Sequence, residues 1–199
     1  MNRSTKPTAA EVAELIRALA RSYVGKPDLV EVKFQEATDG GAAYFILRGA
    51  PDDDSRLVGR SGCHVNALTY LVDQVGRAQG KVFTFRLITK PDGHTPWYPP
   101  QAALEYEPTA AKELLARWLS ALGLSEFDLA VTAGDGPRRS LFFNFDVSVE
   151  NRSEAEALFA ATEGEASIVG SLGTLWRAIS KQAGVRFQIR LVDGAAKLR

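Results

Sequence analysis

The chain has 199 residues, 45% of them hydrophobic and 24% charged, a composition typical of a protein that folds around a buried core. It carries 24 basic and 24 acidic side chains. This balance excludes a uniformly basic nucleic-acid-binding protein but leaves room for a local basic patch. A single cysteine, two histidines and the lack of a long apolar run argue against disulfides, a structural metal site and a membrane span. We therefore expect a cytoplasmic protein that has no cofactor, binds no metal and does not associate with a membrane.

The first half of the chain shows helical and strand patterns in the order α-β-β-α-α-β. Thr8 and Glu11 have the spacing of a capping box, and apolar residues with helical periodicity follow as far as Val24. Alternation and turn residues then predict strands over residues 29–34 and 43–47, a short helical turn that opens at Pro51, a longer helix with its apolar face over 65–75, and a third strand over 82–88.

The second half repeats this pattern in the same order. Three short stretches of the first half recur later in the chain: Pro-Thr-Ala-Ala, a Gly-x-x-Gly tetrapeptide and an apolar strand. Recurrence in a fixed order indicates a duplicated unit. The helices predicted in this copy are marked by apolar residues over 114–122, by a capping box at 153–156 with a helix through 159, and by apolar residues over 175–179. The predicted strands are residues 128–132, 141–149 and 185–192.

Residues 91–107 separate the two copies. Their first ten positions contain Pro91, Pro96, Pro99 and Pro100, and such a density of proline excludes a helix or a central strand. The sequence therefore predicts three parts: a domain over residues 1–90, a proline-rich linker over 91–107, and a second domain over 108–199.

Residues 50–62 carry a family resemblance. They contain Ala-Pro-Asp-Asp, then three further residues, an apolar pair, and the tetrapeptide Gly59-Arg60-Ser61-Gly62 at the start of a predicted helix. This segment resembles the centre of bacterial KH domains, most closely the small type II KH proteins of the KhpA type. The resemblance implies tandem type II KH-like domains in an α+β fold, each with a three-stranded sheet packed by helices.

The resemblance also implies a non-enzymatic protein that binds single-stranded RNA through the first copy. Two glycines let the backbone approach a phosphate, and a helix N-terminus favours an anion. KH domains hold about four nucleotides in this way. The residues implied in RNA binding are the tetrapeptide and four neighbours: Gly59, Arg60, Ser61, Gly62, Arg56, His64, Arg48 and Val58.

The second copy departs from this pattern. Its tetrapeptide, Gly170-Ser171-Leu172-Gly173, contains no basic residue and follows Glu163 and Glu165. Phosphate binding needs positive charge nearby, so we expect a second glycine loop that binds RNA poorly, in a degenerate KH-like domain used for packing or pairing.

Several alternatives stay open at this stage. The fold could instead serve as a protein–protein interaction or self-association module, which the zero net charge favours. The tetrapeptide at 59–62 could be a simple strand-to-helix connection. The acidic run Asp52-Asp53-Asp54 could bind a metal, although a helix start favours acidic side chains for electrostatic reasons alone.

Overall fold

The computed structural model describes residues 6–89, 107–124, 126–135, 141–149 and 167–192. They form a mixed α+β fold with two three-stranded sheets, as predicted from the sequence. None of the described helices is long and apolar enough to cross a membrane.

The first unit has the element order predicted from the sequence. Its main elements are α1 (Ala9–Arg21), β1 (Glu31–Glu36), β2 (Ala42–Arg48), α2 (Asp54–Val58), α3 (Cys63–Gln79) and β3 (Val82–Leu87). Strand β2 is central: it pairs antiparallel with β1 and parallel with β3. The parallel pair requires a crossover connection, and residues 49–81, including α2 and α3, provide it.

Local sequence signals account for the beginning of α1. The Thr8 hydroxyl accepts a hydrogen bond from the Glu11 N–H at 3.3 Å, and the Glu11 carboxylate accepts one from the Thr8 N–H at 2.7 Å. This is the predicted capping box, which satisfies two N–H groups at the helix start. The strand predicted from residue 29 begins later, because Pro27–Leu29 forms a 3₁₀ turn before β1.

The second unit repeats the connectivity of the first. It contains α4 (Pro108–Ala121), β4 (Phe127–Asp135), β5 (Leu141–Val149), α6 (Ile168–Ala183) and β6 (Arg186–Leu191). Strand β5 pairs antiparallel with β4 and parallel with β6, as β2 does in the first sheet. The helix predicted from residue 153 lies outside the described residues, as does the predicted linker except for Glu107.

The prediction of a second glycine loop is wrong. Gly170, Ser171, Leu172 and Gly173 all lie within α6. The Ser167 side chain caps this helix by accepting a hydrogen bond from the Gly170 N–H at 2.9 Å. Ser171 and Leu172 are buried in the core, whereas Gly170 is exposed.

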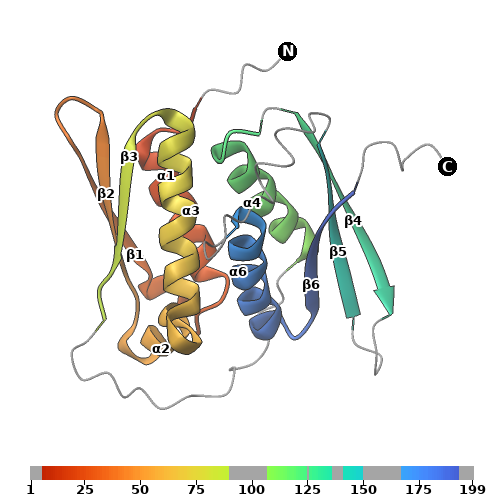
Figure 1. Ribbon diagram of the computed structural model, residues 1–199. Helices are drawn as coiled ribbons and strands as arrows, with labels where there is room; N and C mark the ends of the chain where they lie inside the picture. Colours follow the sequence, from red (N-terminus) through yellow and green to blue (C-terminus); the bar gives the residue numbers. More distant parts are fainter. Residues whose placement is uncertain (1–5, 90–106, 125, 136–140, 150–166, 193–199) are drawn as a thin grey trace.

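The two units pack through their helices, with a sheet on each outer side (Figure 1). Helix α3 contacts α6, and α1 contacts α4. Buried side chains from both units form one hydrophobic cluster, in which Trp118 and Trp176 are fully buried. The inner face of each sheet is therefore covered by helices, whereas the outer face has no described element packed on it. The predicted domain boundaries remain predictions.

Candidate nucleic-acid interface

The tetrapeptide Gly59-Arg60-Ser61-Gly62 forms a tight loop between α2 and α3. Gly59, Ser61 and Gly62 have positive φ angles of 75°, 53° and 77°, and Ser61 is the only described residue other than glycine with a positive φ. Residues 60–62 form one 3₁₀ turn, with the Gly62 N–H donating to the Gly59 carbonyl at 3.1 Å. A side chain at position 59 is nearly excluded, because a Cβ added to Gly59 would lie 2.6 Å from His64 Cγ and 2.8 Å from the His64 backbone nitrogen.

This loop leaves the N-terminus of α3 open to an anion. Gly62 occupies the cap position and forms no side-chain capping bond, and the first turn of α3 contains no acidic residue. The helix start carries partial positive charge and unsatisfied N–H groups. Arg60 and Ser61 are both exposed beside it, so a mobile guanidinium and a hydroxyl flank the positive end of a 17-residue helix.

His64 lies beneath the loop rather than projecting from it. Its ring is half-buried, Nδ1 lies 2.6 Å from the Arg56 carbonyl oxygen, and the ring packs edge-on against Tyr23 with centroids 5.5 Å apart. Burial lowers the pKa of His64 and the positive charge of Lys181 lowers it further, while the Arg56 carbonyl acts in the opposite direction. A neutral ring with the proton on Nδ1 suits these contacts, so His64 supports the loop from below.

Arg56 is held by a buried carboxylate. Its Nη1 lies 3.0 Å from Asp53 Oδ1. The same carboxylate accepts hydrogen bonds from the backbone N–H groups of Gly25 and Lys26 at 2.8 and 2.9 Å. Asp53 therefore fastens the short helix before the loop to the segment between α1 and β1. Because Arg56 also serves this anchor, its charge is less available to a ligand than that of Arg60.

Sequence reasoning missed the role of Asp53. It treated the acidic run as a helix start, and Asp52 and Asp53 do lie in the 3₁₀ turn Pro51–Asp53. Asp53, however, is 2% exposed and binds backbone groups almost thirty positions earlier in the chain, a partnership that no local pattern encodes. No group of three or more metal-ligating side chains occurs among the described residues.

The two remaining predicted site residues lie in different places. Val58 is the partly buried last residue of α2 and directly precedes the loop. Arg48 is exposed at the end of β2, where it follows the buried Leu47. Because side chains alternate along a strand, Arg48 points to the outer face of the sheet, away from the helices. The structure thus brings together the loop, Arg56, His64 and Val58, but places Arg48 on the other face of the sheet.

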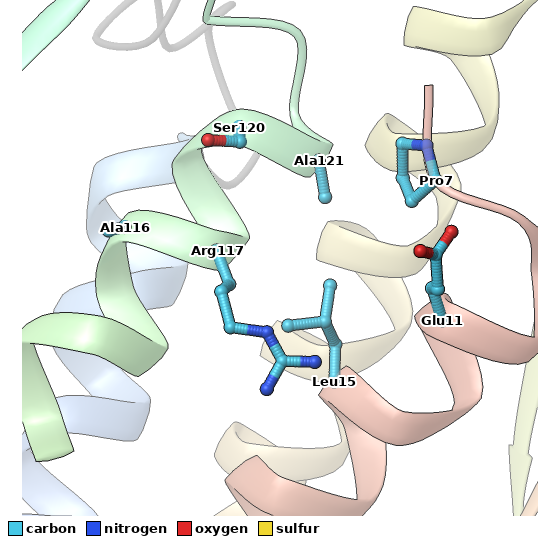
Figure 2. A pocket seen from close by; sticks show the side chains of 7 residues that line it. All are labelled: Pro7, Glu11, Leu15, Ala116, Arg117, Ser120 and Ala121. Atoms are coloured by element: carbon cyan, nitrogen blue, oxygen red, sulfur yellow. The ribbon is translucent and has the colours of Figure 1, made fainter. Parts of the chain in front are cut away.

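A separate hollow of about 280 Å³ lies between the two units. It is lined by residues from the start of α1 and the end of α4: Pro7, Glu11, Leu15, Ala116, Arg117, Ser120 and Ala121. Figure 2 shows Glu11 and Arg117 on opposite walls. Hydrogen bonds from the Thr8 backbone and hydroxyl lower the pKa of Glu11, so this carboxylate already serves as a helix cap.

The chain matches no protein-family model and no curated protein. The assignment of a function therefore depends on the geometry of the loop and on the resemblance described above.

Proposed function

We propose that the chain binds single-stranded RNA through its first unit, with the loop at residues 59–62 as a clamp for the RNA backbone. The observation that carries this proposal is the exposed Arg60 next to the open, positively charged start of α3. On this proposal, the first unit is a type II KH-like domain and the second is a related unit without a clamp.

The element order supports the resemblance to the KH family. In the first unit, the tetrapeptide lies between the short helix α2 and the long helix α3 of an α-β-β-α-α-β arrangement, where the family resemblance requires it. A tight loop without a Cβ at Gly59 and Gly62 lets a phosphate approach the backbone N–H groups closely. Arg60 then supplies the charge, and bases on neighbouring nucleotides are free to contact side chains nearby.

The second unit supports a division of roles. Its corresponding tetrapeptide is part of α6, where Ser171 and Leu172 are 3% and 0% exposed. The Gly170 N–H donates to the Ser167 hydroxyl and the Ser171 N–H to the Ser167 carbonyl, so neither group is offered to a phosphate. On this proposal, one clamp serves the whole chain, and its affinity for RNA is modest and falls as salt rises, because few phosphates are contacted.

The test is fluorescence anisotropy with a mixed pool of single-stranded RNA at two salt concentrations. The variant Arg60→Asp/Ser61→Asp places two negative charges in the loop, and we expect it to lose binding while keeping a native circular-dichroism spectrum. A matched control is Thr109→Asp/Lys112→Asp, which makes the same change in charge at two exposed positions of α4.

Three outcomes are informative. Loss of binding in the loop variant but not in the α4 variant supports the clamp. Equal loss in both variants means that overall charge, not the loop, governs binding. If the natural protein binds no RNA in the pool, the RNA proposal is wrong and a protein-interaction role becomes the better explanation.

A further inference from the structure

The outer faces of the two sheets differ in chemistry although their strands pair in the same way. Alternation along each strand assigns the outward residues, since their neighbours Ala43, Phe45 and Leu47 in β2, and Phe145 and Val147 in β5, are buried under the helices. Register then aligns each outward residue of the first sheet with a counterpart in the second.

One row across the first sheet contains Lys33, Ile46 and Arg86, which are cross-strand neighbours. The equivalent row of the second sheet contains Ala130, Asp146 and Arg190. There Asp146 forms two hydrogen bonds with Arg190, at 2.8 and 3.1 Å. No described residue forms an ion pair with Lys33 or Arg86. The same arginine position is therefore neutralised in one sheet and left charged in the other.

The next row of the first sheet is centred on an aromatic ring. Tyr44 lies between Gln35 and Thr84 and is half-buried on the outer face. An open hollow of about 270 Å³ adjoins it, lined by Gln35, Glu36, Ala37, Ala42, Ala43, Tyr44, Val82 and Thr84. The second sheet has Asn144 and Gln188 in the row that corresponds to Tyr44 and Thr84, so this row carries two amides where the first sheet has the Tyr44 ring.

Charge indicates which ligand suits this face. Its outward residues include three basic side chains, Lys33, Arg48 and Arg86, and one acidic side chain, Glu31. A positively charged surface with an accessible aromatic ring and an adjoining hollow has the chemistry that binds single-stranded nucleic acid, in which bases stack on the ring and phosphates meet the cations.

We propose that the outer face of the β1-β2-β3 sheet is a second RNA-contact surface, which binds the part of the strand that extends beyond the clamp. Tyr44 stacks on a base, and Lys33, Arg48 and Arg86 contact phosphates. This inference rests on the proposed RNA binding and extends it to a face that the clamp does not use.

The path of the chain makes the two surfaces adjacent at one end of the first unit. Strand β2 ends at Arg48, and residues 49–58 lead directly from it to the loop; α2 and the start of α3 lie at the lower end of the unit in Figure 1. An RNA strand that leaves the loop at this end can turn past Arg48 onto the outer face, and from there pass Lys33 and Arg86 before Tyr44.

The test compares two RNA lengths, one of about four nucleotides, which fills the clamp alone, and one of about twelve, within the range that a single sheet platform contacts. We expect Tyr44→Ser to weaken binding of the longer RNA by about tenfold and to leave the shorter unchanged. Lys33→Gln/Arg86→Gln should also reduce the slope of log Kd against log salt for the longer RNA by about 1.4, the value for two lost phosphate contacts. The matched control is Lys112→Gln/Arg186→Gln, which removes the same two positive charges at exposed positions of the second unit. It should change the binding of neither RNA.

The outcomes separate this inference from the proposed function. If the outer-face variants bind both lengths normally while Arg60→Asp/Ser61→Asp abolishes binding, the clamp stands and the second surface is wrong. If the outer-face variants weaken binding but the loop variant does not, the sheet is the RNA site and the clamp is wrong. If the control weakens binding as much as the outer-face variants, the effect is one of general charge and the inference is overturned.

Discussion

Two Gly-x-x-Gly tetrapeptides in one chain have opposite structures. The first, at residues 59–62, forms a loop with three positive φ angles, whereas the second, at 170–173, begins a regular helix. Glycine spacing alone therefore does not specify a loop. What differs is the surrounding packing: His64 packs against Gly59 from beneath the loop, while Ser167 caps the helix that contains Gly170.

The largest effect on the free energy of unfolding should come from adding a methyl group at Gly59. Its φ of 75° and ψ of 169° lie in a region that is essentially restricted to glycine, and the new Cβ would collide with His64. Strain and overpacking together suggest that Gly59→Ala lowers the free energy of unfolding by about 4 kcal/mol. Urea denaturation measures this value, and a loss below about 1 kcal/mol would mean that the loop adapts easily.

A smaller loss is expected from weakening the anchor that holds the first loop. Asp53→Asn keeps the shape of the side chain but removes its charge, so Arg56 loses its carboxylate partner and one of the two N–H groups of residues 25 and 26 faces an amide N–H₂ group. We expect a loss of about 2 kcal/mol in the free energy of unfolding. The control is Asp28→Asn, an exposed carboxylate in the 3₁₀ turn Pro27–Leu29, and an equal loss there would contradict a specific role for Asp53.

A glycine-to-alanine substitution in the second tetrapeptide should stabilise the protein, in contrast to Gly59→Ala in the first. Gly173 lies inside α6, and a Cβ at this position would meet no atom within 4 Å. Alanine favours a helix over glycine, so Gly173→Ala should raise the free energy of unfolding by about 0.8 kcal/mol. A destabilised Gly173→Ala protein would show that this glycine needs the freedom of a loop after all.

Lowering the pH should destabilise the protein at His64, the residue that packs beneath the first tetrapeptide. The pKa of His64 is lowered in the folded protein from its usual 6.5, so the unfolded state binds the proton more readily. The stabilisation that the neutral His64 ring contributes is complete above about pH 6.5, and it is lost as the pH falls towards the pKa of His64 in the folded protein. We expect the free energy of unfolding to decrease between pH 7.5 and 5.5, and to do so less in His64→Gln than in His94→Gln, which removes the other histidine of the chain.

Local sequence patterns predicted much of the fold. The capping box at Thr8 and the alternating strands depend on neighbours within a few residues, and both are present. The second tetrapeptide could not be assigned in this way, because the same glycine spacing fits a loop and a helix. The Asp53 anchor was also beyond reach, since its partners meet it only after the chain has folded.

The candidate site was predicted in part for the same reason. The loop and its neighbours Arg56, His64 and Val58 are close in sequence and remain close in space. Arg48 precedes the loop by eleven positions, and the alternation of β2 turns it to the opposite face. A prediction that had followed this alternation would have separated Arg48 from the loop.

The helix-to-helix packing of the two units has a consequence for how the chain can diversify. When two identical copies associate, every substitution appears on both sides of the pair. Here the two halves share one hydrophobic cluster within a single chain, so a residue can change in one half alone. The ion pair at Asp146 has no counterpart at Ile46, and the glycine loop has none in α6. Covalent linkage thus releases the partners from symmetry, and one half can specialise in packing while the other keeps an exposed, strained and charged surface.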